Sequence, residues 1–234
     1  MNNKLNVGFF RGICLAFSFA FKYVKPSVLI FLIVGFTFEK PRLLIIGDSI
    51  SQGYFPFVKQ ALSDKAMVEH NTGNAQDTWH GLKNTEQWLG KDKWDVIQFN
   101  WGLWDLCHRS INASGELVKD VNGKVSTTPE QYRENLDSLV TILQKTGARL
   151  VFVTTTHIPE DSPGRLYGDE MIYNAIAEEV MKKRNVQVSD INSVSKKIHH
   201  KHGKAPGNVH YTEEGKKELS VPIINTLRSI IIKE

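Results

Sequence analysis

Short apolar runs alternate with amphipathic stretches from Pro41 to the end of the chain. The apolar runs have the length of strands and lie at 42–47, 66–71, 94–102, 148–156 and 185–191. Near-continuous apolar strands are typical of a parallel sheet that is covered on both faces. Because helical patterns separate these runs, the sequence predicts an α/β fold: a single three-layer α/β/α domain around a mainly parallel five-stranded sheet.

Three of the helical patterns have clear limits. A capping threonine and a proline, Thr128-Pro129, begin one that ends at Gly147. Another follows Gly168, and the last begins at Thr212. Segment 108–127 is the longest stretch with no predicted element, so we expect it to be a loop that borders the ligand site.

The first 40 residues differ from the rest. Segment 27–38 (SVLIFLIVGFTF) is uncharged and follows Lys22 and Lys25, as in a signal peptide, but a full membrane span needs about 20 apolar residues. A buried strand or helix of the fold is the alternative, although the core does not need one before the first strand. We therefore expect residues 1–40 to be a signal peptide or an N-terminal membrane anchor, which predicts an extracytoplasmic (periplasmic or secreted) or membrane-anchored protein whose domain is 41–234.

Charge and cysteine content narrow the classes of function. The formal net charge of +4 comes from residues 1–40, which leaves the body with equal numbers of acidic and basic residues. A neutral body without a concentrated basic patch gives no electrostatic case for binding nucleic acid. Cys107 is the only cysteine outside the N-terminal segment, so the body has no pair for a disulfide bond.

Two residues near opposite ends of the body have the positions expected of a nucleophile and its base. Asp48 and Ser49 follow the first strand directly and precede a helical stretch, where Asp48 or Ser49 could also serve only as a helix cap. His210 precedes the last helix and, taken alone, could be an exposed loop histidine. Ligands in open parallel sheets bind beyond the carboxyl ends of the strands, so we expect Ser49 and His210 to meet there.

Four ordered sequence blocks resemble those of the SGNH (GDSL) hydrolases. They are IIGDSIS (45–51), NTGNAQDT (71–78), FNWGLWDL (99–106) and NVHYTEEG (208–215), and the resemblance spans roughly 41–230. It implies a flavodoxin-like fold and an esterase or acylhydrolase activity without metal or cofactor. Ser49 would attack the acyl carbon of an ester, and His210 would take its proton and pass it to the leaving alcohol.

The same resemblance implies an oxyanion and pocket set, which comprises Asn100, Gln76, Asn74, Asp48 and Trp104. Three positions depart from the family pattern. Gly207 stands where the family has the aspartate that orients the histidine, which leaves Asp190 or a backbone carbonyl as possible substitutes. Trp104 replaces an asparagine or histidine, and Gln76 replaces a glycine whose N–H serves the oxyanion.

Three functions are therefore open. The first is an exported or membrane-tethered serine esterase that acts on small molecules or acylated carbohydrates. The second is a catalytically impaired relative that binds carbohydrates or esters. The third is a phosphate- or nucleotide-binding flavodoxin-like domain, which the missing glycine-rich phosphate loop argues against.

A few further residues have two interpretations. The histidines at 199, 200 and 202 lie among lysines and are expected on a solvated surface rather than at a metal site. His157 is expected either in a pocket or in a structural loop. Trp101 and Trp104 are the aromatic candidates for a sugar pocket, and Trp94 is expected in the core.

Overall fold

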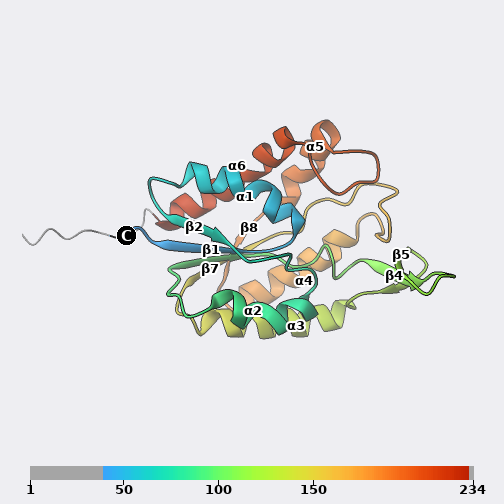
Figure 1. Ribbon diagram of the computed structural model, residues 1–234, viewed down its shortest axis with the longest axis horizontal. Coiled ribbons are helices and arrows are strands. Elements are labelled where there is room, and N and C mark those ends of the chain that lie inside the picture. Colours follow the sequence, from blue (N-terminus) through green and yellow to red (C-terminus); the bar gives the residue numbers. More distant parts are fainter. Residues whose placement is uncertain (1–38, 232–234) are drawn as a thin grey trace, which may run out of the picture. The chain divides into compact units, whose positions relative to one another are not determined.

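The five predicted strands form one parallel sheet (Figure 1). The computed structural model describes residues 39–231. The strands are β1 (Arg42–Ile46), β2 (Met67–His70), β3 (Val96–Phe99), β7 (Arg149–Val153) and β8 (Gln187–Ser189). Their order in the sheet is β2-β1-β3-β7-β8, and every neighbouring pair is parallel. This confirms the fold class that the apolar runs predict.

Helices cover both faces of the sheet (Figure 1). They are α1 (Ser49–Ala61), α2 (Thr78–Leu89), α3 (Pro129–Gln144), α4 (Asp169–Lys183), α5 (Asn192–His202) and α6 (Glu213–Ile231). Helices α1, α5 and α6 lie on one face, and α2, α3 and α4 lie on the other. Residues 43–46 of β1 and all of β3 are buried between these layers, which is why they are apolar except for Gln98, whose side chain donates a hydrogen bond to the Tyr54 hydroxyl.

Helix α3 shows how the sequence sets a boundary. The Thr128 hydroxyl accepts a hydrogen bond from the Gln131 N–H, and the Gln131 side chain accepts one from the Thr128 N–H, which completes a capping box. Pro129 occupies the first helical position, where its missing N–H costs nothing. Leu136 and Leu143, one face of this helix, are fully buried, and each such side chain stabilises the fold by about 1.5–3 kcal/mol.

Segment 108–127 is not the structureless loop that we expected from the sequence. It forms a small antiparallel sheet of β4 (His108–Ile111), β5 (Leu117–Lys119) and β6 (Lys124–Val125), in the order β5-β4-β6. The Asn112 side chain closes the turn between β4 and β5 by accepting hydrogen bonds from the N–H groups of Ser114 and Glu116. These strands are too short and too polar to show a period in the sequence. We refer to residues 108–125 as the β4–β6 sheet.

The predicted signal peptide or anchor at 1–40 lies, apart from Glu39 and Lys40, outside the described residues. Within 39–231, no helix combines the length and the hydropathy that crossing a bilayer requires.

Candidate active site

Ser49 is the first residue of α1, directly beyond the carboxyl end of β1. Asp48 is the N-cap, and its Oδ1 accepts a hydrogen bond from the Ile50 N–H at 2.9 Å. The capping function that the sequence allowed for either residue therefore falls to Asp48. This leaves the half-buried Ser49 side chain free, and its backbone N–H has no acceptor within the helix.

The Ser49 hydroxyl and the His210 ring are in hydrogen-bond contact. Ser49 Oγ lies 2.9 Å from His210 Nε2, although 161 residues separate the two in sequence. His210 lies in the loop before α6, so two loop-to-helix junctions meet at one edge of the sheet, as the sequence predicted. A serine hydroxyl at this distance from an imidazole has the geometry of a nucleophile and its general base.

The other nitrogen of the ring is held by Asn208. The Asn208 Oδ1 accepts a hydrogen bond from the His210 backbone N–H at 2.9 Å and lies 2.8 Å from His210 Nδ1. A backbone N–H can only donate, so it fixes the amide with its oxygen toward the ring. The proton of the neutral ring must then be on Nδ1, which turns the lone pair of Nε2 toward the Ser49 hydroxyl.

Asn208 is the residue that sequence comparison missed. The expected position holds Gly207, which has a φ of +68°, and a Cβ there would lie 2.6 Å from the backbone oxygen of Asp161. Asp190 is not the substitute, because its Oδ1 accepts hydrogen bonds from Thr154 Oγ1 and the Ser193 N–H, both at 3.1 Å. The available signal was an asparagine two residues before the histidine, a spacing at which its side chain can bond to the following backbone.

The surroundings keep Asn208 in place. Its carbonyl oxygen lies 2.7 Å from His199 Nε2, and its N–H donates to the carbonyl of Ala205 at 3.1 Å. His199 is therefore a structural residue rather than part of a solvated surface, and His202 is similar, since it lies 3.2 Å from Glu218. Of the three histidines, His200 alone is exposed as expected. Residues 39–231 contain no cluster of histidine, cysteine or acidic side chains that could hold a metal ion.

Of the two interpretations of His157, a pocket residue or a structural loop residue, the structure supports the second. Its Nδ1 lies 3.1 Å from the buried carboxylate of Glu170, and its ring packs edge-on against Tyr167.

Two of the candidate oxyanion donors, Gln76 and Asn100, donate to other acceptors in this structure. Gln76 has a φ of +49°, and its N–H donates to Asn74 Oδ1 at 2.8 Å. Asn100 Nδ2 donates to the carbonyl of Val153 at 2.7 Å and lies 3.4 Å from Thr155 Oγ1. This leaves the Ser49 N–H at the start of α1, together with the Asn74 amide nitrogen, which donates no hydrogen bond to residues 39–231, as donors without an acceptor. The functions of Gln76, Asn74 and Asn100 toward an oxyanion remain predictions.

The electrostatic environment of His210 favours its neutral form. Burial lowers the pKa of the ring, and the positive charges of Lys119, Arg165, Lys204 and Lys216 lower it further. A neutral imidazole is the form that accepts a proton, so His210 can act as a base over a wide range of pH. The same charges disfavour the imidazolium that proton transfer creates.

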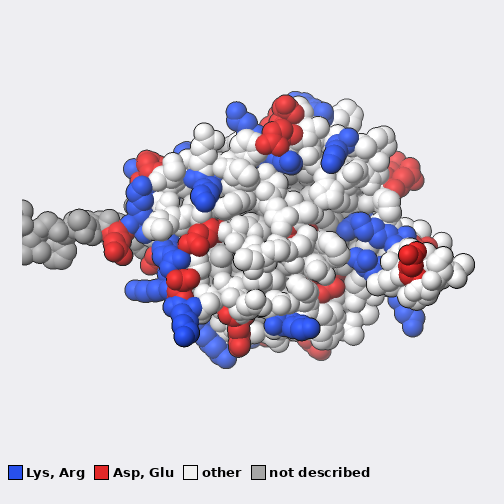
Figure 2. Space-filling model, in the orientation of Figure 1, with Lys and Arg blue, Asp and Glu red and all other residues white. Residues whose placement is uncertain are grey.

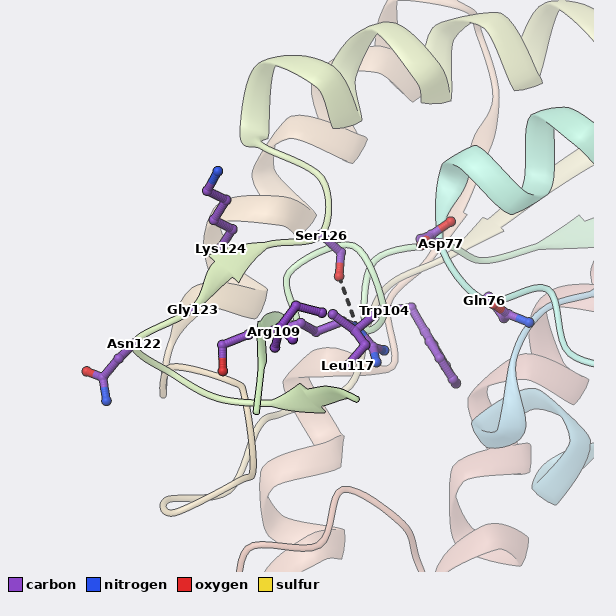
Figure 3. A pocket seen from close by; sticks show the side chains of 11 residues that line it. Gln76, Asp77, Trp104, Arg109, Leu117, Asn122, Gly123, Lys124 and Ser126 are labelled. Carbon is purple, nitrogen blue, oxygen red and sulfur yellow. Dashed lines mark hydrogen bonds between the residues drawn. The ribbon is translucent and has the colours of Figure 1, made fainter. Parts of the chain in front are cut away.

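Trp104 lines a pocket of about 800 Å³ between the β4–β6 sheet and the start of α2 (Figure 3). The guanidinium of Arg109 lies 5.3 Å from the centre of the Trp104 ring, and Gln76 and Asp77 stand across the pocket. Trp101 was the other pocket candidate, and that expectation is wrong. It is 1% exposed, its Nε1 donates to the Ala75 carbonyl, and its ring packs closely against α2.

Asp105 ties the pocket to the rest of the site. Its buried carboxylate accepts hydrogen bonds from the Thr78 N–H at 2.9 Å and from the Thr78 hydroxyl at 2.6 Å. Burial raises the pKa of this carboxyl group to about 7. The segment that carries Trp104 is thereby fixed to the first turn of α2, next to Gln76.

The comparison with protein families decides the classification. Residues 43–222 match the model of the GDSL-like lipase/acylhydrolase family. The chain belongs to this family. Its members are ester hydrolases, and the resemblance of the four sequence blocks is confirmed. No protein with a curated description matches the chain.

Solved structures of the GDSL-like family show the same fold at low sequence identity. The acetyl xylan esterase AlAXEase matches with a TM-score of 0.64 and 16% identity over 80% of this chain and 99% of its own. A lipase/acylhydrolase from Enterococcus faecalis has a TM-score of 0.63 and 17% identity over 81% and 96%. Axe2, an acetylxylan esterase from Geobacillus stearothermophilus, has a TM-score of 0.62 and 17% identity over 79% and 93%.

Proposed function

We propose that this GDSL-like protein is a serine esterase that cleaves carboxylic esters of small molecules or acylated carbohydrates. The observation that carries the proposal is the chain of contacts from Ser49 Oγ through His210 to Asn208 Oδ1. Ser49 attacks the acyl carbon while His210 Nε2 takes the hydroxyl proton. His210 then returns that proton to the leaving alcohol, and water releases the acyl group from Ser49 by the same route.

In this mechanism Asn208 positions the ring but supplies no charge. An aspartate would also stabilise the imidazolium, and removal of that carboxylate from serine proteases lowers kcat by about 10⁴-fold. Much of that loss comes from the wrong tautomer of the histidine. The backbone hydrogen bond from His210 to Asn208 Oδ1 prevents this fault here, so we expect a smaller penalty.

The pocket beside Trp104 supports a carbohydrate as the alcohol. Sugars stack on aromatic faces, and this pocket pairs an indole ring with the polar groups of Arg109, Ser110 and Asn122. Two of the structural neighbours are described as acetyl xylan esterases, which agrees with an acetylated sugar as substrate.

The test is hydrolysis of p-nitrophenyl acetate by the full-length protein. We expect turnover above background, a loss of at least 10³-fold in Ser49→Ala, and no change in Ser63→Ala, an exposed serine just beyond the carboxyl end of α1. Equal rates for wild type and Ser49→Ala would refute the proposal.

A second candidate function rests on the committed oxyanion donors. The hydrogen bonds of Gln76 and Asn100 to Asn74 and Val153 favour a protein that binds esters with little turnover. Saturable binding of an acetylated xylo-oligosaccharide, with no release of acetate beyond that of Ser49→Ala, would support this alternative.

We also propose that residues 1–40 export or anchor the domain. The uncharged stretch at 27–38 after a basic segment supports this. The full-length protein should sediment with membranes or leave the cytoplasm, and the double variant Phe31→Asp, Ile33→Asp should stay in the cytoplasm. Identical fractionation of the two would argue against it.

A further inference from the structure

Three basic side chains near His210 lack an acidic partner. Arg165, Lys119 and Lys204 all lower the pKa of His210 through their charge, and none of them forms an ion pair within residues 39–231. Basic side chains also gather beside the β4–β6 sheet on the face seen in Figure 2. Outside residues 1–40 the protein is neutral, so this is a local concentration of positive charge.

Arg165 is the most unusual of these residues, because it is only 6% exposed. Its Nε donates to the carbonyl of Leu103 at 3.0 Å, and its Nη1 lies 3.4 Å from the carbonyl of Pro163. Its Nη2 makes no hydrogen bond to any described residue. An arginine keeps its charge when buried, and a buried charge without a counter-ion is costly for the fold. Such a residue is more common at a binding site than in a core.

No neighbouring carboxylate neutralises this charge. Asp48 attracts Arg165 at longer range, but it caps α1, and burial raises the pKa of its carboxyl group. The thiol of Cys107 also lies near Arg165 and is buried. Neither group forms a hydrogen bond or ion pair with the guanidinium, so Nη2 stays available to another anion.

Arg165 lines a hollow that also borders His210. This hollow of about 320 Å³ is lined by Arg165, Lys119, Asn208 and His210, among others. Its volume equals that of about ten water molecules, which is ample for a carboxylate or sulfate group with a few attached carbon atoms. Lys119 comes from β5, so the β4–β6 sheet contributes directly to this side of the site.

We propose that this hollow binds an anionic group of the substrate, so that the preferred esters carry a carboxylate or a sulfate close to the scissile bond. The inference rests on the proposed esterase function and specifies its substrate class. The planar fork of Arg165 suits the two oxygens of such a group, and Lys119 adds a second charge. An acetylated acidic sugar has this chemistry.

The test compares two esters that differ in one charge, 4-acetoxybenzoate and its neutral methyl ester. Each kcat/KM of the full-length protein is divided by the hydroxide-catalysed rate of the same ester, which removes their difference in intrinsic reactivity. We expect a preference for the anion of about tenfold, the effect of one charge-assisted hydrogen bond. The preference should approach one in Arg165→Met and survive in part in Arg165→Lys. Exposed Lys119→Gln should reduce it without affecting folding, and Lys91→Gln, an exposed lysine between α2 and β3 that lines neither pocket, should leave it unchanged.

A binding measurement separates this inference from the proposed function. Calorimetric titration of Ser49→Ala with the two esters needs no catalysis, and we expect the anion to bind about tenfold more tightly. Preferential binding without turnover in wild type would uphold the anion site and refute the esterase. Equal binding and equal normalised rates of the two esters, or a preference that persists in both Arg165→Met and Lys119→Gln, would overturn the inference.

Discussion

Replacement of Asn208 by aspartate should restore the charge that the site lacks. The carboxylate can accept both hydrogen bonds that the Asn208 Oδ1 accepts now, from the His210 N–H and from Nδ1. The amide nitrogen of Asn208 donates no hydrogen bond to residues 39–231, so its replacement by oxygen breaks no contact. The variant therefore changes the charge beside His210 with little change in geometry.

The magnitude follows from the distance and from the exposure of the ring. Unit charges 4 Å apart interact by about 1 kcal/mol in water and by about 4 kcal/mol at an effective dielectric constant of 20. His210 is half-buried, so an intermediate value of about 2 kcal/mol is appropriate. Since about 1.4 kcal/mol changes a rate tenfold, kcat should rise by about 10- to 100-fold.

The assay is the hydrolysis of p-nitrophenyl acetate as a function of pH. A new negative charge raises the pKa of His210, so the acid limb of the profile should move to higher pH, and kcat should be compared at pH 8 or above. Asn208→Ala, which removes the acceptor, should lower kcat by about 10²-fold or more. Thermal unfolding serves to check that each variant is folded.

Gly207→Asp is the informative control, because it places the carboxylate where the family has it. With a φ of +68° and a Cβ 2.6 Å from the Asp161 carbonyl, an aspartate at 207 is strained and should not increase kcat. An increase in Gly207→Asp without one in Asn208→Asp would refute the assignment of Asn208 as the orienting residue.

Three further predictions concern the surroundings of the dyad. Gln76→Gly removes a left-handed glutamine and should raise the free energy of unfolding by about 1 kcal/mol in thermal or denaturant unfolding; a loss of stability would contradict the strain. Trp104→Ala should raise KM for acetylated xylo-oligosaccharides by about two- to tenfold and leave p-nitrophenyl acetate unaffected. Trp79→Ala, 48% exposed and outside the pocket, is its control. Asp105 has a pKa of about 7, above its unfolded value, so it stabilises the fold below about pH 4 and progressively less as the pH rises to 7. Asp105→Asn should therefore destabilise less at pH 8 than at pH 5, and an equal effect at both would contradict the shift.

The layers of the fold could be predicted from the sequence because burial of the sheet on both faces requires apolar residues in its central strands, which appear as apolar runs in the sequence. Residues 43–46 of β1 are all apolar and Gln98 is the one polar residue of β3, and the start of α3 follows from its capping box. The end of α3 lies at Gln144, three residues before the glycine that the sequence pointed to. The β4–β6 sheet left no such signal. Its strands are two to four residues long and none of their residues is fully buried, so side-chain hydrogen bonds in the turns rather than hydrophobic burial define it.

The residues of the candidate site that lie at the ends of helices and strands could be predicted from the sequence. Those that depend on contacts between side chains could not. Ser49 and His210 follow from their positions at loop-to-helix junctions. The orienting residue does not, because the acceptor moved by one position along the chain from the expected residue, to Asn208. The support of Asn208 by His199 is equally invisible in sequence, since it joins a helix to a loop through a backbone carbonyl.

The neutral acceptor and the unpaired cations act on His210 in the same direction. Asn208 is neutral and lacks the negative charge that would stabilise the imidazolium, and the positive charges of Arg165 and Lys119 destabilise it. On a neutral ester both effects raise the barrier of the proton-transfer step. An anion in the hollow beside Arg165 would offset them, because it lies next to the same ring and opposes the same charges. If both proposals hold, the substrate itself would supply the negative charge that the aspartate of a serine-protease triad supplies. Asn208→Asp should accordingly accelerate neutral esters more than anionic ones. The new carboxylate partly neutralises the positive charge of Arg165 and so weakens its attraction for an anionic substrate.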